Sequence, residues 1–281
     1  MKKIKVKIPA KINLTLDVSG SNGGYHEINS LVSPVSVYDV ITVRKRKDGL
    51  ITLSEKGLSS ECETLNNNAY KAASAFVKEF KTTGADISLY KNIPVGGGLG
   101  GSSADIAGTL IALKKLYNIN GDILPLADAL GSDSGYMVGG GAAVISGRGE
   151  KIKRLPKIPT LYLLIVTEKE KCAAGQSYKS FDEIGKTYAP ATEKAVKAIK
   201  SGNLGEFFGA LKNDLFEGSL KIVPTIKDNI ASLTAVGADA ALMTGSGSCA
   251  YGAFINKKAR DRAYKKLLPK FGGRLIKAKT L

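Results

Sequence analysis

A run of glycines that leads directly into a helical pattern constrains this chain more than any other feature. Five of the six residues 96–101 are glycines, Ser102 and Ser103 follow, and apolar residues then recur at helical spacing over 103–117. Glycine lets the backbone approach a ligand closely, and the first turn of a helix carries N–H groups without a partner inside the helix. Together with the positive end of the helix dipole, these groups predict an anion site that suits a polyphosphate.

Two common nucleotide-binding patterns describe this region less well. Gly96, Gly98 and Gly101 satisfy GxGxxG, but a dinucleotide-binding fold places that loop after its first strand, and this one lies a third of the way along the chain. The P-loop pattern GxxxxGK[ST] fails at 185–187, because Ser180 stands where the first glycine is required. A tight turn that caps a helix is the plainer alternative, and the length of the glycine run favours phosphate binding over it.

Hydrophobic periodicity predicts an α+β protein of two units, with strands grouped rather than alternating regularly with helices. The expected strands are 3–8, 13–18, 39–46, 85–91, 139–146 and 160–166, with one more after a Gly/Ser turn within 242–254. The expected helices are 66–80, 103–117, 192–201 and 204–215. Pro156 and Pro159 mark the crossing between the units, so we expect an N-terminal domain over 1–152 and a C-terminal domain over 153–281.

The composition of the 281 residues is typical of a globular protein, with 43% hydrophobic and 23% charged residues. No run of about 18 consecutive apolar residues predicts a membrane-spanning helix, and the N-terminal residues alternate like a strand rather than a signal peptide. We therefore expect a cytoplasmic protein. Three scattered cysteines give no disulfide framework, and the single histidine, His26, excludes a metal site built on imidazoles.

The formal net charge of +16 favours an anionic partner. Ten lysines and arginines lie within 257–279, against one acid, Asp261. A nucleic-acid-binding protein shows such a basic stretch, and so does a solvated terminal helix. No aromatic-rich RNA-binding motif accompanies the charge. We therefore keep nucleic acid as an alternative partner and an anionic metabolite as the main one.

The glycine loop and several other motifs resemble the GHMP kinases, the family of galactokinase, homoserine kinase, mevalonate kinase and phosphomevalonate kinase. The loop from Pro94 to Ser103 is similar to the segment that holds the ATP phosphates in these enzymes. The other matching motifs follow the order of the family between about residues 7 and 254. They are Pro9-Ala10-Lys11-Ile12-Asn13-Leu14, Gly24-Tyr25-His26-Glu27-Ile28, Asn67 with Tyr70-Lys71-Ala72-Ala73, Gly131-Ser132-Asp133, Gly139-Gly140, Gly147-Arg148-Gly149-Glu150, Asn213-Asp214-Leu215 and Met243-Thr244-Gly245-Ser246-Gly247-Ser248.

The wider pattern is most similar to the branch that phosphorylates the 2-hydroxyl of 4-diphosphocytidyl-2-C-methyl-D-erythritol in non-mevalonate isoprenoid precursor biosynthesis. The resemblance implies a two-lobed α+β fold with the active site in the cleft between the lobes. It also implies ATP and Mg²⁺ as cofactors and the cytidine diphosphate-linked methylerythritol as the small-molecule substrate. The oligomeric state stays open.

The resemblance also assigns roles to individual residues. Asp133 would accept the proton of the attacking hydroxyl, and Lys11 would stabilise the developing negative charge. Strand alternation places Lys11 and Asn13 on one face, which suits the wall of a pocket. The implied ligand-binding residues are, for ATP, Pro94, Gly96, Gly97, Gly98, Leu99, Gly100, Gly101, Ser102, Ser103 and Asn67; for the acceptor, Asn13, Tyr25 and His26; and for Mg²⁺, Ser102 or Ser103.

Two stretches depart from the usual sequence of that branch. Residues 19–23 lack the basic residue and the acid that normally precede Gly-Tyr-His, and 134–137 replace the usual Val-Pro-Phe-Phe. Both departures concern the acceptor rather than ATP. They leave open a GHMP kinase for another small alcohol, such as mevalonate, a sugar or homoserine. A non-catalytic nucleotide-binding protein on the same fold is a further alternative, and the presence of both Asp133 and the glycine loop favours an enzyme over it.

Overall fold

A computed structural model describes residues 2–22, 25–59, 62–156 and 158–281. The chain forms two compact units, each assembled from separate segments. The first unit comprises 1–10, 37–95 and 100–140, and the second comprises 11–36, 96–99 and 141–281. This partition differs from the predicted cut at residue 152, because the long strands β1 (Lys3–Asn13) and β3 (Tyr25–Lys45) each contribute residues to both units. None of the described helices is long and apolar enough to span a membrane.

The first unit contains a sheet in which β3 pairs with both β1 and β5. Strands β3 and β5 (Ala85–Lys91) run antiparallel, in a register that extends from Val40 opposite Tyr90 to Lys45 opposite Ala85. Strand β4 (Thr52–Gly57) pairs parallel with β5 on its other side. The side chains of β5 alternate between buried and less buried positions, as expected for a sheet with one covered face.

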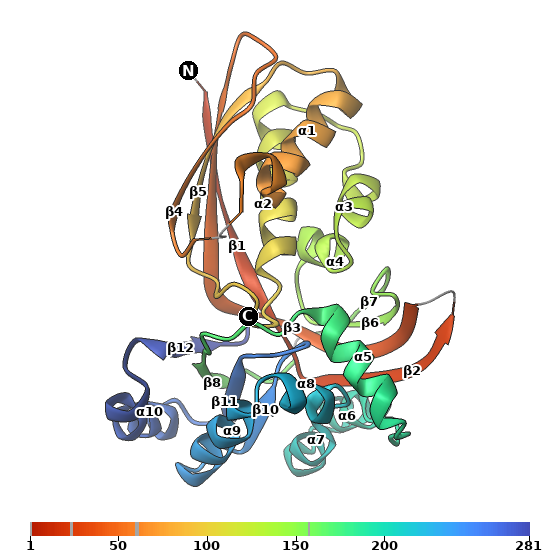
Figure 1. Cartoon of the computed structure of the whole chain (residues 1–281), viewed down its shortest axis with the longest axis vertical. Coiled ribbons are helices and arrows are strands. Elements are labelled where there is room, and N and C mark those ends of the chain that lie inside the picture. Colours follow the sequence, from red (N-terminus) through yellow and green to blue (C-terminus); the bar gives the residue numbers. More distant parts are fainter. Residues whose placement is uncertain (1, 23–24, 60–61, 157) are drawn as a thin grey trace. The chain divides into compact units, whose positions relative to one another are not determined.

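Helices cover that face of the sheet (Figure 1). They are α1 (Asn68–Phe80), α2 (Gly101–Tyr117), α3 (Leu124–Leu130) and α4 (Ser134–Gly139), preceded by the 3₁₀ helix η1 (Thr64–Asn66). Helix α2 lies very close to the sheet, because a Cβ atom added at Gly108 would stand 2.5 Å from Ile41 Cδ1 and 3.2 Å from Ile8 Cγ2. A larger residue at Gly108 would therefore push the helix away from β1 and β3.

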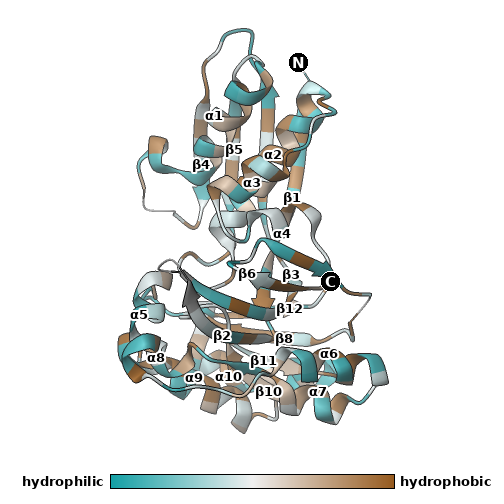
Figure 2. Cartoon of the chain, turned by 90° about the vertical axis from the view of Figure 1, so that its right-hand side faces the viewer, coloured by the Kyte–Doolittle hydropathy of each residue, from teal (hydrophilic) through white to brown (hydrophobic). Residues whose placement is uncertain are grey.

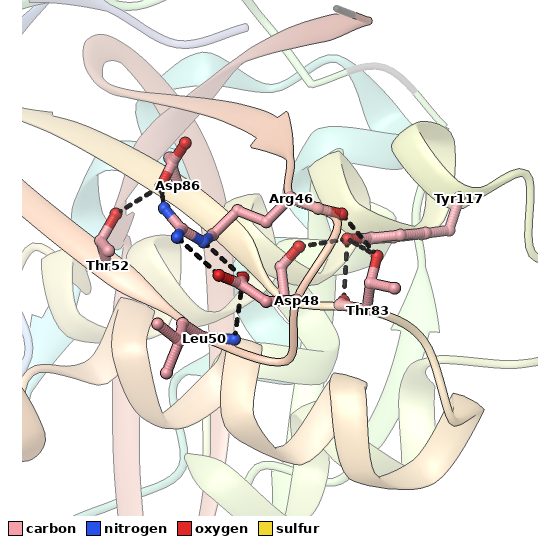
Figure 3. A network of polar contacts seen from close by, with 8 residues as sticks. Arg46, Asp48, Leu50, Thr52, Thr83, Asp86 and Tyr117 are labelled. Atoms are coloured by element: carbon pink, nitrogen blue, oxygen red, sulfur yellow. Dashed lines mark hydrogen bonds and ion pairs between the residues drawn. The ribbon is translucent and has the colours of Figure 1, made fainter.

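A polar network at one edge of the first unit connects the strand ends (Figure 3). The Arg46 guanidinium donates to Asp48 through Nε and Nη2, at 2.7 and 2.8 Å, and to Asp86 Oδ1 through Nη1 at 2.7 Å. Thr52 Oγ1 also donates to Asp86 Oδ1, at 2.8 Å. The hydrogen bonds from Arg46 lower the pKa of the Asp48 carboxyl to about 2. Because the network is exposed, we expect it to fix the loop geometry rather than to contribute much stability.

The second unit is built around a four-stranded antiparallel sheet with the order β10-β11-β8-β12. The strands are β8 (Tyr162–Val166), β10 (Ala240–Met243), β11 (Ala250–Phe254) and β12 (Leu275–Lys279). Helices α9 (Thr225–Ala235) and α10 (Lys257–Phe271) pack on it, and their side chains form a core with both central strands. Every residue of β11 is buried. The apolar core around β11 therefore fixes the positions of both ends of this strand, and the residues near the two ends differ in chemical character.

The rest of the second unit includes the N-terminal half of β3. Strand β2 (Thr15–Asn22) and β6 (Ala143–Gly147) both pair antiparallel with β3. The remaining elements are β7 (Lys151–Arg154), α5 (Ala174–Ile184), α6 (Thr192–Ser201), α7 (Leu204–Ala210), β9 (Lys212–Asn213), α8 (Phe216–Ile222) and η2 (Gly272–Arg274). Helices α6 and α7 carry both hydrophilic and hydrophobic sides (Figure 2), which is typical of helices at a protein surface.

Several predicted elements match the structure closely, and others were wrong in extent. The strand 85–91 and the helix 192–201 have the predicted bounds, and α1, α2 and β8 begin within two residues of prediction. The predicted helix 204–215 ends at Ala210, because 212–213 form a strand that pairs with β2. The predicted strand 139–146 begins only at Ala143, since Gly139 still belongs to α4. Strand β3 starts at Tyr25, far before the predicted residue 39.

Candidate active site

The first part of the glycine loop packs tightly against the Gly/Ser turn of the second unit. Cys249 N donates to Gly97 O at 3.2 Å, and Thr244 Oγ1 donates to Gly98 O at 3.4 Å. A Cβ atom added at Gly97 would stand 2.2 Å from Cys249 Sγ, and one at Gly98 would stand 2.0 Å from Thr244 O. Gly98 also has a φ of +77°, which side-chain-bearing residues rarely adopt. Glycine is therefore required at both positions by direct contact with the 244–249 turn.

Lys11 and Asn13 belong to the same environment. Lys11 Nζ donates to Asn13 Oδ1 at 2.7 Å, which confirms that the two side chains share one face of the strand. Lys11 N donates to Leu99 O at 3.0 Å, and Asn13 N donates to Thr244 Oγ1 at 3.0 Å. The end of β1, the glycine loop and the 244–249 turn thus meet in one place. Lys11 is 6% exposed, so its ammonium lies in a largely enclosed, polar setting.

The second part of the glycine loop forms the start of α2 in the first unit. Gly100 precedes the helix with a φ of 73° and provides no capping side chain. Among the described residues, no acceptor bonds the backbone amides of Gly101, Ser102 and Ser103. Ser102 is exposed and Ser103 is half-buried. A 17-residue helix therefore presents unpaired amides and the positive end of its dipole at the loop, as predicted for an anion site.

Asp133 lies close to this helix start within the first unit. A Cβ atom added at Gly131 would stand 2.7 Å from Ser134 Oγ and 3.5 Å from Ser103 Oγ, so the turn that contains Asp133 adjoins the first turn of α2. Helix α4 lies beside α2 (Figure 1). Asp133 stands at the N-cap position of α4, but its side chain makes no capping hydrogen bond. The carboxylate is half-buried and does not have the capping role that its turn-like surroundings suggest.

A buried ion triad connects the two ends of the loop that carries Pro94. Lys91 Nζ, at the end of β5, donates to Asp39 Oδ2 at 2.7 Å and to Asp105 Oδ2, on α2, at 2.5 Å. The backbone amides of Asn92 and Ile93 donate to Asp39 Oδ1 at 2.6 and 2.8 Å. The three charged side chains are 0–5% exposed. Because Asp105 binds Lys91 in the interior, it is unsuited to hold a metal ion at the helix start.

The triad predicts a pH dependence of stability. Burial raises the pKa of the Asp105 carboxyl to about 8, against the opposing effect of the Lys91 ammonium. The folded protein therefore binds this proton more tightly than the unfolded chain, where the pKa is near 3.8. The contribution to the free energy of unfolding is complete below about pH 4 and is lost as the pH rises through about 8.

We expect Asp105→Asn to remove this dependence. The stability of the natural protein relative to the variant should fall, by a few kcal/mol, between pH 4 and pH 9. Urea unfolding of both proteins across this range gives the difference between their free energies of unfolding. The contributions of the other titrating groups cancel in this difference. Parallel stability curves would contradict the assignment of the proton to Asp105.

His26 lies in an aromatic cluster that the sequence did not reveal. Its ring stacks on Tyr178, with centroids 4.8 Å apart, and meets the edge of Phe181 at 6.1 Å. His26 Nε2 and Asp182 Oδ1 are 2.6 Å apart. All three partners lie on α5, about 150 residues further along the chain, where the helical spacing of two aromatic residues was the only available signal. Tyr25 begins β3, and its side chain lies outside what the structure describes, as do Gly23 and Gly24 entirely.

Two asparagines of the predicted motifs hold backbone in place. Asn67 Oδ1 accepts from Ala69 N at the start of α1, and Nδ2 donates to Glu55 Oε2 at 2.9 Å. Asn213 Nδ2 donates to Met243 O at 3.0 Å and to Gly245 O at 2.8 Å, and these two hydrogen bonds stabilise the backbone of the Gly/Ser turn. A contact of Asn67 with adenine stays a prediction, because the capping role alone accounts for its buried position.

The donor set agrees with a magnesium ion that is held mainly by a bound nucleotide. No cluster of three histidine, cysteine or acidic side chains suitable for a metal exists among the residues that the structure describes. Mg²⁺ in phosphoryl-transfer sites keeps several waters and takes only one or two protein oxygens beside those of the phosphates. The hydroxyls of Ser102 and Ser103, at the start of α2, are compatible with that requirement.

Comparison with known proteins places these features in a family. The profile of the GHMP kinases N terminal domain matches residues 67–149, and that of the GHMP kinases C terminal domain matches 195–273. The chain belongs to the GHMP kinases, and it is an ATP-dependent small-molecule kinase.

Its relatives point to one branch of this family. The chain is 37% identical to a 4-diphosphocytidyl-2-C-methyl-D-erythritol kinase of Caldanaerobacter subterraneus subsp. tengcongensis, over 93% of this chain and 92% of the relative. A crystal structure of 4-(cytidine 5'-diphospho)-2C-methyl-D-erythritol kinase superimposes with a TM-score of 0.84, 28% identity and 99% coverage of both chains. The mevalonate kinase of L. major shares the fold alone, with a TM-score of 0.77 and 15% identity over 98% of this chain and 95% of that one.

Proposed function

We propose that this kinase transfers the γ-phosphoryl group of ATP to the 2-hydroxyl of 4-diphosphocytidyl-2-C-methyl-D-erythritol. The bond between the γ-phosphorus and the β–γ bridging oxygen breaks, and a bond between that phosphorus and the acceptor oxygen forms. The products are ADP and the 2-phosphate of the acceptor. The single observation that carries this choice of acceptor is the 37% identity, over 93% of the chain, to a relative named for the same substrate.

The phosphate end of ATP is proposed to bind where the glycine loop meets α2. The unpaired amides of Gly101, Ser102 and Ser103 and the dipole of a 17-residue helix favour polyphosphate there. When Mg²⁺ is bound, it neutralises charge on the β- and γ-phosphates, and the hydroxyl of Ser102 or Ser103 would hold it. Magnesium and a cytoplasmic location remain predictions from the sequence.

The cytidine end of the acceptor is proposed to bind at His26. The ring of His26 offers a hydrogen-bonding edge, and Tyr178 and Phe181 add flat apolar surfaces of the kind that stack on a nucleobase. Asp182 orients the imidazole by its contact with Nε2. This cluster supports an acceptor that carries a base, in preference to mevalonate, homoserine or a simple sugar.

Asp133 and Lys11 are proposed as the residues that act on the reacting groups. Asp133 accepts the proton of the attacking hydroxyl as the new bond to phosphorus forms. Lys11, which is largely enclosed and bound to Asn13, stabilises the negative charge on the phosphoryl group in transfer. Both roles come from the resemblance to GHMP kinases, and the half-buried, non-capping side chain of Asp133 is compatible with its role.

An acceptor panel tests the proposed substrate. ADP release by the purified protein with Mg-ATP would be measured with the cytidyl substrate, its methylerythritol 4-phosphate fragment, mevalonate, homoserine and galactose. We expect turnover with the cytidyl substrate, and a loss of at least about a hundredfold in kcat/KM for the fragment, because the nucleotide contacts are absent. Faster turnover of another alcohol would replace the acceptor, and ATP binding without any turnover would favour a non-catalytic protein.

Gly98→Ala should damage the ATP site through the backbone alone. The added methyl group would stand 2.0 Å from Thr244 O at a residue whose φ is +77°, so the loop must shift. We expect kcat/KM for ATP to fall by about 10- to 100-fold, since small displacements of positioning groups have effects of this size. Gly209→Ala on α7, where a Cβ atom meets nothing within 4 Å, is the matched control and should change kcat/KM less than twofold. Normal ATP kinetics in Gly98→Ala would contradict the placement of the phosphates.

A further inference from the structure

A basic pocket of the second unit has no part in the reaction proposed above. It has a volume of about 360 Å³ and is lined by residues at the start of α10 and at the end of β12. Figure 1 labels both elements. The residues that line it are Ser36, Tyr162, Lys257, Arg260, Lys277, Ala278 and Lys279. Four of these seven side chains are cationic and none is acidic. A cavity of this size accommodates a small molecule rather than a protein segment.

The fold gathers these cations by a simple register. Lys279 pairs with Tyr162, and Lys277 pairs with Leu164, across the antiparallel strands β12 and β8, so these side chains share one face of the sheet. Further along, the same face is apolar and packs beneath Leu267 and Phe271 of α10. The surface under α10 therefore changes from apolar to basic at the end of the sheet where the helix starts.

Arg260 is built into the wall of this pocket. It is only 7% exposed, and its Nη1 donates to Ala278 O at 3.0 Å and to Leu163 O at 3.4 Å. Its Nε donates to Asp261 Oδ1 at 2.9 Å, and its guanidinium lies over the Tyr162 ring. Nη2 donates to no acceptor among the described residues, and this nitrogen is accessible to solvent. An anchored guanidinium thus keeps one donor edge open to solvent, an arrangement suited to an oxyanion.

The charge of the pocket is poorly balanced. Asp261 is the only carboxylate in ion-pair contact with these cations among the described residues, at 2.9 Å from Arg260 and 3.9 Å from Lys257. Lys277 lies over the ring of Tyr264, and neither it nor Lys279 has a carboxylate partner in the described part of the chain. Like charges held together in this way favour a multivalent anion that bridges them.

The pocket is separate from the Gly/Ser turn that contacts the glycine loop. That turn precedes β11 at Ala250, which pairs with Val166, whereas the pocket lies at the other end of the sheet, at Tyr162. Five residues of extended strand separate these two ends, a length of about 13 Å. A ligand in the pocket therefore occupies a different location from one bound against the turn.

We infer that this pocket is a second anion site, which binds the phosphate or diphosphate group of a small phosphorylated molecule. Nucleic acid is the less favoured partner, because the recognised group sits in a concave pocket whose wall includes the buried Arg260. The other basic residues of α10, including Lys258 and Lys266, are exposed like the pocket lysines but do not line the pocket. They provide a control with the same charge and no part in the cavity.

Titration with inorganic pyrophosphate, followed by the backbone amide resonances of β12 and the start of α10, tests this inference. We expect saturable shifts at Tyr162, Ala278 and Lys279, with a dissociation constant on the order of 1 mM or tighter. The double substitution Lys277→Gln/Lys279→Gln should weaken binding at these resonances by about tenfold or more. Lys258→Gln/Lys266→Gln, with the same loss of charge, should change it less than twofold.

Three results would overturn the inference. The first is the absence of saturable shifts at these positions, while thermal unfolding shows that the variants are folded. The second is equal weakening in both double variants, which would mean diffuse attraction by net charge. The third is a short single-stranded RNA that binds more tightly than pyrophosphate and depends on Lys258 and Lys266 rather than on the pocket lysines, which would make the basic stretch a nucleic-acid surface.

Discussion

Asp133→Asn is expected to lower kcat by about 10²- to 10⁴-fold while the KM for ATP changes less than about twofold. The amide has the shape of the carboxylate but cannot accept the proton of the attacking hydroxyl. The amide also keeps the size of the side chain, so we expect the variant to fold, and thermal unfolding checks this. ADP release at saturating ATP and acceptor gives kcat, and calorimetric titration with a non-hydrolysable ATP analogue gives nucleotide affinity.

Glu79→Gln is the matched control for this substitution. It removes the same charge from an exposed residue of α1, in the same unit as Asp133, and should change kcat less than about twofold. A variant at Asp133 that retains near-normal turnover would remove this residue from the mechanism. A loss of turnover accompanied by an equal loss of ATP affinity would instead indicate a structural role in the nucleotide site.

Lys91→Met should have the largest effect on stability. The substitution removes the cation that lies 2.7 and 2.5 Å from Asp39 and Asp105, and it leaves the carboxylate of Asp39 in the interior without a countercharge. Asp105, whose pKa burial raises to about 8, is mostly protonated near pH 7. Removing one partner of a buried ion pair costs about 3–5 kcal/mol, because a buried charge loses its compensation. We expect the free energy of unfolding of the first unit to fall by this amount near pH 7. Urea unfolding, followed by probes in that unit, measures it.

Lys56→Met provides the comparison for this loss. Lys56 lies exposed on β4, and no ion pair of its side chain is present among the described residues, so its replacement should change stability by less than about 0.5 kcal/mol. A destabilisation below about 1 kcal/mol in Lys91→Met would mean that the triad does not behave as a buried charge cluster. Partial recovery in Lys91→Met/Asp39→Asn would assign the loss to the uncompensated carboxylate of Asp39.

The triad also connects stability to the candidate active site. Asp39 accepts from the amides of Asn92 and Ile93, just before Pro94, and Asp105 lies in the second turn of α2. Lys91 binds both carboxylates, so it holds the two ends of the glycine-rich segment within one unit. We therefore expect Lys91→Met to raise the KM for ATP as well, under conditions in which the variant remains folded.

Local patterns predicted the elements that depend on local periodicity. The alternation of 85–91 and the amphipathic run of 192–201 carry their own signal, and both have the expected bounds. The glycine run and the serines after it predicted an anion site because glycine conformation and helix termini are properties of the neighbouring residues alone. The unpaired amides at the start of α2 follow from the same local cause.

Features that depend on distant partners were not predictable in this way. Residues 204–215 have a helical pattern throughout, but Lys212 and Asn213 pair with β2 and leave the helix. The aromatic neighbours of His26 lie on α5, and the two acidic side chains that accept hydrogen bonds from Lys91 come from β3 and α2. Periodicity says which face of an element is apolar, but not which other element will cover it. The basic stretch 257–279 was visible as charge, and only the β8–β12 register shows that part of it lines a pocket.

Identification of the phosphorylated product tests the central claim most directly. The purified protein would be incubated with Mg-ATP and 4-diphosphocytidyl-2-C-methyl-D-erythritol, and the products would be resolved by phosphorus and carbon NMR. The account predicts one new phosphate monoester per ADP formed, attached to the oxygen of C2, with the diphosphate bridge to cytidine intact. Phosphate on another hydroxyl, or ADP released with only inorganic phosphate, would contradict it.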